Sequence, residues 1–511
     1  MLRVSASDVD KLTRGCGTFG ALKVRPRAKP SGWARRYDNN QPFLHGLIRD
    51  LCLNFHDDPR AEDWDGLNAL LNEALDRCGL HAGLRQYARQ AIENYLECHD
   101  VIQEEIGPLQ LKVCDPQVPV GHNRFLNVWA HVYTTPNGIR EVRRLRLGST
   151  RKLGSDPDPW TIVAAHVVSL VRPIGEVSRV RVVEIGLGDG SWEVTFDGTP
   201  QEANSAYEAV AIPRILKIVS SQSTIPGYSC KECKIAGLCD SLESLDGFLG
   251  QVNPGACTRS VSARDIEVYE VCPAQWHLSS SSFLPRADAS SAASSRGVNV
   301  HRTLAQAHSG VDRCTPQSFD DHISHLSDTE ILEARPFLAN HPENCPVEDG
   351  VQIIGSEVSI YGYDAQADLV IASKPDLVYV DADGTLVIRE TKTTTKEIPE
   401  TEAEAFDKYL AVPWLINLFG SGYKGPYHSE AARLELEVIS PTENRLFSWD
   451  LDDHGLLRMA RKEVRLRARD WHSDSVWKAR PGNHCDWCPV RKWCPDARVA
   501  DDSGSENETR Y

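Results

Sequence analysis

One spacing of cysteines occurs twice in this chain. Two triads follow the pattern C-x2-C-x5-C, and their members are Cys230, Cys233 and Cys239 in the first and Cys485, Cys488 and Cys494 in the second. A further cysteine lies far upstream of each triad, Cys16 and Cys272 respectively, and each follows a Ser-Ala-x-Asp segment. The triads repeat at 255 residues and the upstream cysteines at 256. The chain is therefore predicted to contain one unit of this length twice.

The period of the repeat predicts the domain organisation, because it is far too long for a solenoid and indicates two tandem copies of one domain. We expect the copies to span 1–247 and 258–497. The segment LGQVNPGAC between them supplies the glycine and proline of a short linker. Residues 498–511 are acidic and polar and are expected to form a disordered tail.

The composition is that of a soluble globular protein, with 41% hydrophobic and 25% charged residues among 511. No apolar run approaches the ~18 residues that span a bilayer, and the N-terminus lacks a signal-peptide pattern. We therefore expect a cytoplasmic protein without a membrane partner. The net charge of −16 argues against nucleic-acid binding over the whole surface, but it does not exclude a local basic groove.

The fifteen cysteines are expected to stay mostly reduced, so the clustered ones are candidate metal ligands. A site that joined the upstream cysteine to the triad would tie together the two ends of a domain. Metal ligation can supply the folding free energy that closing so long a loop requires. Four thiolates suit a zinc ion or an iron–sulfur cluster, and both remain open at this point.

The segment KPDLVYVDADGTLVIRETKTTTK in the second copy is predicted to form a β-hairpin that turns at Asp383-Gly384. Along its second strand, period-two alternation places Leu386 and Ile388 on the same face as Glu390 and Lys392. Asp376, at the start of the first strand, is expected to lie near Glu390. Two carboxylates beside a lysine can hold Mg²⁺ or Mn²⁺ and stabilise negative charge on a phosphate, although an exposed salt bridge has the same composition.

Two upstream residues are weaker candidates for the same site. His301 lies at helical spacing with Val298 and Leu304, which predicts the buried face of a short helix, where a histidine is usually a core residue. Glu357 lies in a strand-like segment and would add a carboxylate.

Taken in order, these elements resemble the RecB-like branch of the PD-(D/E)XK nucleases that carries a four-cysteine iron–sulfur cluster, as in the AddB nuclease domain and the CRISPR-associated spacer-processing nucleases. The resemblance covers 260–497 and implies two α/β restriction-endonuclease-like domains in tandem, each a mixed central sheet flanked by helices. It implies that His301, Asp376 and Glu390 bind Mg²⁺ or Mn²⁺ and that Lys392 is the catalytic lysine. It also implies that a 4Fe-4S cluster is held by Cys272, Cys485, Cys488 and Cys494, and a second one by Cys16, Cys230, Cys233 and Cys239.

One departure from the family concerns the helix after the lysine. The family usually has Gln-x-x-x-Tyr there, whereas this chain has Ala405 in place of the glutamine and retains Tyr409. The positioning of DNA by this helix is therefore in doubt. The apolar residues that follow keep helical spacing, and Pro413 predicts that their helix begins or kinks at that residue.

The first copy is predicted to have lost the metal site. Matching Gly138 to Gly384 aligns the two hairpins without gaps and replaces Asp376, Glu390 and Lys392 by Ala130, Arg144 and Arg146. His45 keeps its spacing to His301 but would be a ligand without partners. Four arginines form a hypothetical phosphate-binding surface, namely Arg140, Arg143, Arg144 and Arg146. A solvated basic strand edge that discourages aggregation is the alternative.

The sequence therefore predicts a metal-dependent DNA nuclease that hydrolyses phosphodiester bonds as an exonuclease or end-processing enzyme. Its role would lie in DNA repair or antiviral defence, with a helicase or defence-system protein as a further partner. The alternative is a non-catalytic DNA- or protein-binding scaffold with structural clusters or zinc. Loss of cutting without loss of fold on substitution of Asp376 or Glu390 separates the two.

Overall fold

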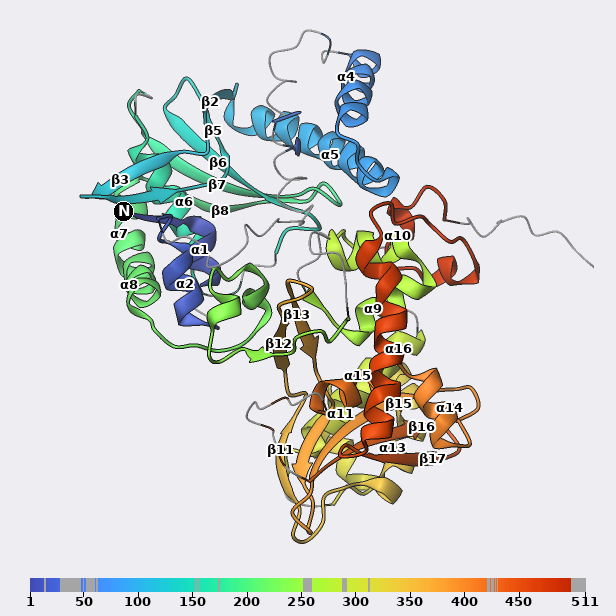
Figure 1. Cartoon of the computed structure of the whole chain (residues 1–511). Helices are drawn as coiled ribbons and strands as arrows, with labels where there is room; N and C mark the ends of the chain where they lie inside the picture. The colour runs from blue at the N-terminus through green and yellow to red at the C-terminus, as the bar shows by residue number, and fades with distance from the viewer. Residues whose placement is uncertain are drawn as a thin grey trace, which may run out of the picture.

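In the computed structural model the chain folds into two lobes, which follow each other in sequence (Figure 1). The structure describes residues 1–12, 15–27, 47–48, 50–51, 60, 63–151, 154, 156–172, 175–250, 260–286, 292–310, 313–420, 423, 427, 429 and 431–497.

The first lobe has a five-stranded sheet and a three-stranded sheet covered by helices. Its strands are β1 (Leu2–Ser5), β2 (Gln110–Cys114), β3 (Gln117–Gly121), β4 (Arg124–Asn127), β5 (His131–Thr134), β6 (Ile139–Arg146), β7 (Arg179–Gly186) and β8 (Trp192–Gly198). Its helices are α1 (Ala6–Lys11), α2 (Gly17–Lys23), α4 (Trp64–Arg77), α5 (Ala82–Ile106), α6 (Pro159–Leu170), α7 (Pro200–Ala206), η2 (Tyr207–Ala211) and α8 (Ile212–Ser220), followed by the 3-10 turns η3 (Tyr228–Glu232) and η4 (Ala236–Leu238).

The second lobe has a five-stranded sheet and a smaller four-stranded one. Its strands are β10 (Ser260–Val261), β11 (Gln352–Ser356), β12 (Ile360–Asp364), β13 (Leu369–Ser373), β14 (Leu377–Val380), β15 (Leu386–Thr393), β16 (Ala432–Ile439) and β17 (Asn444–Asp450). Its helices are α9 (Ala263–Val271), α10 (Pro273–Trp276), η5 (His277–Ser281), α11 (Ala292–Ala307), η6 (Gln317–Phe319), α12 (Asp320–Ile323), α13 (Asp328–Asn340), η7 (His341–Asn344), α14 (Glu402–Lys408), α15 (Ala411–Gly420), α16 (His454–Ser473), η8 (Asn483–Trp487) and η9 (Arg491–Trp493).

The two five-stranded sheets have the same construction. Their strand orders are β2-β5-β6-β7-β8 and β11-β14-β15-β16-β17. In each sheet a parallel pair, β6 with β7 or β15 with β16, is flanked by antiparallel strands on both sides. The smaller sheets also correspond, because β1 with β4 and β10 with β13 are both parallel. The expected mixed α/β class, with mixed sheets flanked by helices, is confirmed.

The two hairpins next to the parallel pairs have one register. Val132 lies opposite Val142 in the first lobe, and Val378 lies opposite Ile388 in the second. Both members of the second pair lie 246 residues after their counterparts, which is the offset that the turn glycines predict. Those glycines have positive φ angles of 80° at Gly138 and 88° at Gly384, which explains why glycine occupies both turns. The pairing therefore agrees with the gap-free alignment of the two hairpins.

The repeated Ser-Ala-x-Asp segments are capping boxes. Ser5 and Asp8 begin α1, and Ser262 and Asp265 begin α9, with each hydroxyl accepting from the aspartate N–H and each carboxylate accepting from the serine N–H. The repeat next to each upstream cysteine therefore reflects the start of a helix that holds the cysteine in place.

The core of the second lobe lies between its large sheet and the helices α9, α14, α15 and α16. Leu386, Ile388, Leu434 and Trp414 belong to this core and are at most 3% exposed. Val387, on the opposite face of β15, packs with Leu377 and Tyr379 instead. The predicted alternation along β15 is confirmed. No helix among the described residues is long and apolar enough to cross a membrane.

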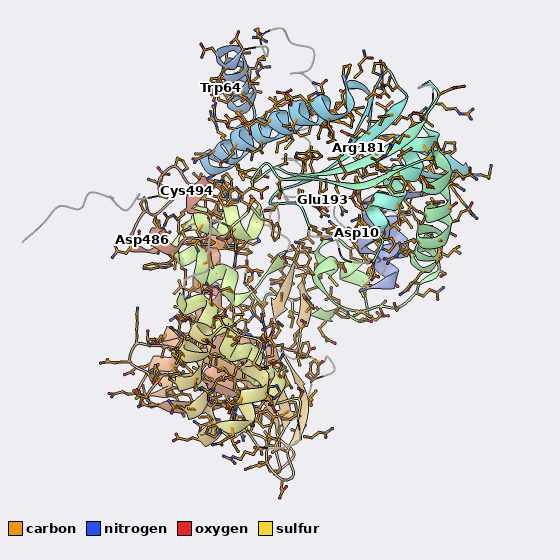
Figure 2. All side chains as sticks on the ribbon, turned by 180° about the vertical axis from the view of Figure 1, so that it is seen from behind. Asp10, Trp64, Arg181, Glu193, Asp486 and Cys494 are labelled. Atoms are coloured by element: carbon orange, nitrogen blue, oxygen red, sulfur yellow. The ribbon has the colours of Figure 1, made fainter. Side chains whose placement is uncertain are left out.

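The two lobes pack against each other through the end of the chain. Trp493 and Val490 join the core around α5 of the first lobe. Gln86 donates from Nε2 to the carbonyl of Lys492 over 2.8 Å. Figure 2 shows Cys494 at the end of the second lobe that faces α5. Strand β9 (Glu243–Ser244) adds a second connection, since it pairs in parallel with β12.

Candidate active site

Three elements of the second lobe bring the predicted site residues together. His301 lies on α11, Asp376 directly precedes β14, and Glu390 and Lys392 lie on β15. Because β14 and β15 pair with Leu377 opposite Arg389, Asp376 lies beside the part of β15 that carries Glu390 and Lys392. The apolar face of the strand thus ends in a charged pair, as predicted.

Hydrogen bonds hold the carboxylates in place. Oδ1 of Asp376 lies 2.8 Å from Nδ1 of His301, and Oδ2 accepts the N–H of Thr391 over 2.7 Å. Nζ of Lys392 donates to Oε1 of Glu390 over 2.6 Å. The site therefore consists of two charged pairs that meet at the start of β14 and the C-terminal half of β15.

Glu357 joins His301 and Asp376 in a compact group, in which one ligand atom from each residue lies within 4.8 Å of the others. Its N–H donates to the carbonyl of Asp376 over 2.8 Å, and its carboxylate pairs with Lys374. The expectation that Glu357 lies within a strand is wrong: it follows β11 and has a positive φ of 55°. This left-handed residue turns the chain so that the side chain reaches the site.

The charges within the site shift the pKa values of its members. Burial alone would raise the pKa of Asp376, but the neighbouring His301 outweighs burial and holds this pKa below its usual range. Burial lowers the pKa of Lys392, but Glu390 and Asp376 outweigh it and raise this pKa above its usual range. Burial raises the pKa of Glu390, and Lys392 only partly offsets that rise. Asp376 is therefore an anion and Lys392 a cation at neutral pH.

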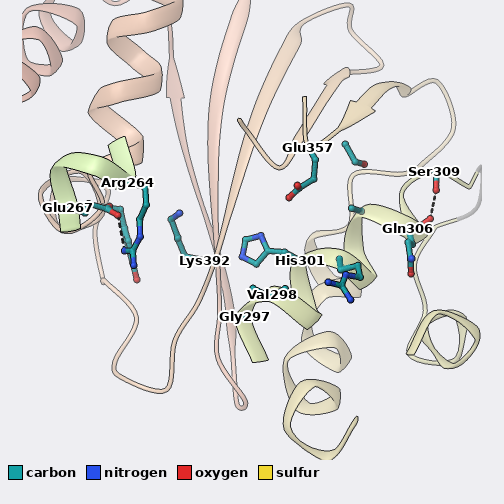
Figure 3. Close-up of a pocket in the computed structure, with 13 residues that line it drawn as sticks. Arg264, Glu267, Gly297, Val298, His301, Gln306, Ser309, Glu357 and Lys392 are labelled. Atoms are coloured by element: carbon teal, nitrogen blue, oxygen red, sulfur yellow. Dashed lines mark hydrogen bonds and ion pairs between the residues drawn. The ribbon is translucent and has the colours of Figure 1, made fainter. Parts of the chain in front are cut away.

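An open cleft of about 980 Å³ adjoins these groups. Figure 3 shows the side chains of Lys392, His301 and Glu357 along this cleft, with Arg264 and Glu267 of α9 beyond Lys392. The cleft gives a substrate access from solvent to His301, Glu357 and Lys392, whereas Asp376 and Glu390 do not line it and are reached through their pairs with His301 and Lys392.

The α11 helix differs in part from its prediction. Leu304 is buried at 4% exposure, as expected of the inner face. Val298 is 53% exposed and lines the cleft, so it does not belong to a buried face. His301 lies between these two, with a side chain that is 24% exposed. Its position at the edge of the cleft explains why it contacts Asp376 rather than the core.

Tyr409 lies at the end of α14 and lines the cleft. Its hydroxyl is buried and has no hydrogen-bond partner among the described residues. Ala405, where the family pattern has glutamine, is fully buried. The next helix, α15, begins at Ala411, two residues before the start that Pro413 predicts, and the proline lies in its first turn.

In the first lobe, arginines and their acidic partners occupy the position that matches the site. Arg144 donates to Asp10 over 2.7 Å and to Asp158 over 2.9 Å. Arg146 pairs with Glu184 over 2.8 Å. Asp115, whose φ is 49°, donates its N–H to the carbonyl of Ala130 over 2.9 Å, as Glu357 does to Asp376. The backbone frame is therefore the same in both lobes, while the side chains differ.

The first-lobe arginines are engaged within the lobe. Arg140, Arg143 and Arg144 are 4%, 2% and 7% exposed. Arg140 donates to carbonyls at the end of α6, and Arg143 pairs with Glu141 over 2.8 Å. These contacts support neither the phosphate-binding hypothesis nor a solvated strand edge, because both require exposed guanidinium groups. His45 lies outside the described residues.

Each predicted cysteine quartet gathers around one small enclosed space. The linings include Cys16, Cys230, Cys233 and Cys239 in the first lobe, and Cys272, Cys485, Cys488 and Cys494 in the second. Backbone N–H groups face the sulfurs in both lobes: Gly227 donates to Cys230 over 3.3 Å, and Arg480 donates to Cys272 over 3.4 Å. The distant upstream cysteines therefore join their triads in space.

The sequence interpretation missed a second compact group in the same lobe. His308, Cys314, His341 and Cys345 are all buried, and one ligand atom from each lies within 4.8 Å of the others. The signal was present as two short pairs, H-x5-C and H-x3-C, separated by 26 residues. Neither pair has the C-x2-C-x5-C spacing of the triads, so the repeated spacing in the sequence does not indicate this group.

Comparison with known proteins supports the identification of one domain. Residues 260–495 match the model of a family described as the PD-(D/E)XK nuclease superfamily. The second lobe thus contains a PD-(D/E)XK nuclease superfamily domain, and members of that superfamily are typically nucleases that use divalent metals. A solved structure described as "Crystal structure of SSO0001" is 15% identical over 47% of this chain and 88% of that chain, with a TM-score of 0.22. The search of curated proteins found no match.

Proposed function

We propose that the second lobe is a metal-dependent deoxyribonuclease that hydrolyses phosphodiester bonds at single strands or duplex ends. The observation that carries the proposal lies inside the matched domain, where His301 and Lys392 line one open cleft and are hydrogen-bonded to Asp376 and Glu390 respectively. A purely structural salt bridge between Glu390 and Lys392 would not require the Asp376 carboxylate and the His301 imidazole beside it.

The donor atoms fit a divalent cation. Carboxylate oxygens suit Mg²⁺, and the addition of an imidazole suits Mn²⁺. His301, Asp376 and Glu390 are the proposed ligands. Glu357 is a fourth candidate because it forms the compact group with His301 and Asp376, whereas Glu390 lies outside that group and is paired with Lys392. When bound, the ion would polarise the scissile phosphate and lower the pKa of an attacking water.

Lys392 would contact the substrate directly, and Tyr409 lines the same cleft. The Lys392 ammonium, held 2.6 Å from Glu390, is a donor and not a base, so it would stabilise the negative charge that develops on the phosphate. Tyr409 lines the cleft, but its hydroxyl is buried, so the ring would have to move before this hydroxyl could donate to the DNA backbone. These roles replace the glutamine contact that Ala405 cannot make.

We also propose that the two lobes are a tandem duplication, with domains at 1–247 and 258–497. Equal strand orders, equal hairpin registers and matching capping boxes support this proposal. The first lobe would be inactive, since its counterparts of Asp376 and Glu390 are Ala130 and Arg144. Its role would then be that of a scaffold.

We propose a 4Fe-4S cluster for each cysteine quartet. A single zinc ion bound at ~2.3 Å would hold its four sulfurs about 4 Å apart. Among the described residues, the groups with ligand atoms within 4.8 Å of one another include neither quartet. The cysteines thus surround a common space more loosely than one ion requires, which favours a wider cluster.

The test is cleavage of end-labelled single-stranded and duplex DNA by chain purified without oxygen, with RNA as a comparison. We expect cleavage in Mg²⁺ or Mn²⁺, none in EDTA, and loss of cleavage without loss of fold in Asp376→Asn and Glu390→Gln. Asp407→Asn is the matched control, because Asp407 is exposed on α14 away from the cleft. A wild-type chain that binds DNA but never cuts it would indicate the scaffold instead.

A further inference from the structure

The buried group of His308, Cys314, His341 and Cys345 lies in the second lobe, apart from the cleft and from both cysteine quartets. Its members are 5%, 3%, 0% and 4% exposed. His308 follows α11, Cys314 lies in the segment after it, His341 begins η7, and Cys345 follows η7. Three separate segments thus direct four metal-binding side chains to one point.

The two imidazoles face each other. Their Nε2 atoms are 3.0 Å apart, and the ring centroids are 5.0 Å apart. Nδ1 of His341 lies 2.8 Å from Oε1 of Glu437, a carboxylate with 0% exposure. A proton on Nδ1 would be donated to that carboxylate, which leaves the Nε2 lone pair directed at the centre of the group.

The two thiols complete the arrangement. Sγ of Cys345 accepts the N–H of Cys314 over 3.3 Å, so both cysteines lie side by side. The surroundings are apolar: Val300, Leu304, Phe319 and Phe337 belong to the small core that contains Cys314 and Cys345. The two imidazoles and two thiols are therefore enclosed by apolar side chains.

We infer that these four residues form a closed zinc site with two sulfur and two nitrogen ligands. Zn²⁺ binds sulfur at ~2.3 Å and imidazole nitrogen at ~2.0 Å in a tetrahedron, which places neighbouring ligand atoms between about 3 and 4 Å apart. The compact arrangement within 4.8 Å fits one ion better than a cluster. Four protein ligands leave no open position, so the site is structural.

Glu437 supports this assignment from the outer shell. Histidines that bind zinc commonly donate their other ring N–H to a carboxylate, which fixes the ring and its tautomer. Glu437 lies on β16 and also accepts from Nδ2 of Asn444 over 2.7 Å. The site therefore ties the end of α11 and the η7 turn to the central sheet.

The zinc site and the cleft share the helix α11, because His301 lies on this helix seven residues before His308. The zinc site would hold the C-terminal end of α11, a helix whose residues line the cleft from Gly297 to Gln306. The assignment of this zinc site does not depend on the proposed nuclease activity, since none of its four ligands lines the cleft.

The test combines metal analysis with zinc K-edge X-ray absorption on the full-length chain, after EDTA has stripped the cleft. We expect a zinc ion with imidazole nitrogen and sulfur in its first shell. Nitrogen scattering is diagnostic, because neither cysteine quartet contains histidine. Zinc with sulfur ligands alone, or no zinc at all, would overturn the assignment.

Variants localise the ion. Cys345→Ala should remove one zinc per chain and leave the iron content unchanged, whereas Cys345→His should retain the zinc because histidine also ligates it. Cys114→Ser is the control, since this exposed cysteine lies in neither cysteine quartet and is not a member of the His308 group. A folded Cys345→Ala chain with unchanged zinc, or a Cys314–Cys345 disulfide found by mass spectrometry, would contradict the assignment. Should Cys345→Ala fail to fold, the absorption spectrum of the wild type decides alone.

Discussion

Asp376 connects three elements of the candidate active site. One carboxylate oxygen meets His301, the other accepts from Thr391, and the carbonyl accepts from Glu357. Asp376, which directly precedes β14, therefore orients the His301 imidazole, the strand β15 and Glu357 at once. Small shifts of Asp376 would change all of these contacts together, which makes the site dependent on the register of the β14–β15 hairpin.

Replacing Lys392 should lower the rate of cleavage without removing the cation. Lys392→Met keeps the length of the side chain but loses the charge that would stabilise the phosphate, and loss of one such donor typically lowers kcat by ~100-fold or more. Single-turnover cleavage measures the rate, and Mn²⁺ titration measures cation binding. Lys396→Met is the control, because Lys396 is exposed and does not line the cleft. Cleavage within twofold of the wild type would remove Lys392 from the reaction.

At the scale of single residues, the sequence predicts the pairing of Asp376, Glu390 and Lys392 because alternation along a strand determines which side chains share a face. It assigns Glu357 to a strand because it cannot detect a left-handed residue that is not glycine. The sequence also shows the arginines of the first copy but not the acidic residues that pair with them in space. Asp10 and Asp158, which neutralise Arg144, lie far from it in the chain, so the charge pattern alone suggested an exposed basic surface.

The strand β15 has a second polar face that the active site does not use. Arg389 donates to Glu435 over 2.9 Å, and Tyr379 donates to the same carboxylate over 2.7 Å. Arg389 and Glu435 are 3% and 4% exposed. This buried ion pair holds β14, β15 and β16 together beneath the residues of the cleft.

Removal of Arg389 should destabilise the second lobe strongly. Arg389→Met removes the buried counterion of Glu435 and leaves only the partly exposed Arg433 beside this carboxylate; loss of a buried partner typically costs about 3–5 kcal/mol, and Arg433 would offset part of it. Urea unfolding measures the difference, and the exposed Arg458→Met is the control. A loss below 1 kcal/mol would mean that water or a rearranged side chain replaces the guanidinium.

At the scale of elements, the hairpins and the α15 helix could be predicted because turn glycines and hydrophobic periodicity are local signals. The order of strands across the sheet could not, since it depends on pairing between distant segments such as β15 and β16. The His308 group shows the same limit. Its members come from irregular segments, where no periodicity indicates which side chains point inward.

The lobes meet around His277, which stacks on Trp477 with ring centroids 3.9 Å apart and lies 5.4 Å from His81. His277 is 1% exposed, and burial lowers its pKa to about 3. Burial also lowers the pKa of His81. The contact between the lobes thus requires neutral imidazoles.

Acid should therefore weaken the contact. The unfolded chain takes up a proton at a His277 pKa of 6.5, whereas the folded chain does so only near 3, so the stability is complete above pH 6.5 and is lost as the pH falls towards 3. At pH 5 the loss from this residue is about 2 kcal/mol. Urea unfolding at pH 7 and pH 5 should differ less in His277→Gln than in the wild type. An equal pH dependence in both chains would exclude His277 as the cause.

The whole molecule should hold two iron–sulfur clusters with four iron atoms each. Chain purified without oxygen should contain about eight iron atoms, and Cys233→Ser and Cys488→Ser should each lose half of them. Cys233→Ser should leave cleavage intact because its quartet lies in the first lobe. Iron and sulfide analysis with cleavage assays checks both statements. Colourless protein with zinc in both quartets would contradict them.

Our proposal is that the second lobe cuts DNA and the first lobe does not. Its most direct test is the residual cleavage of end-labelled DNA in Mn²⁺ by the full chain that carries both Asp376→Asn and Glu390→Gln. We expect the wild type to cut and the double variant, folded and with its clusters intact, to cut no faster than Mn²⁺ alone. Cleavage by the double variant at a rate near that of the wild type would place the catalytic site elsewhere in the chain and contradict the account.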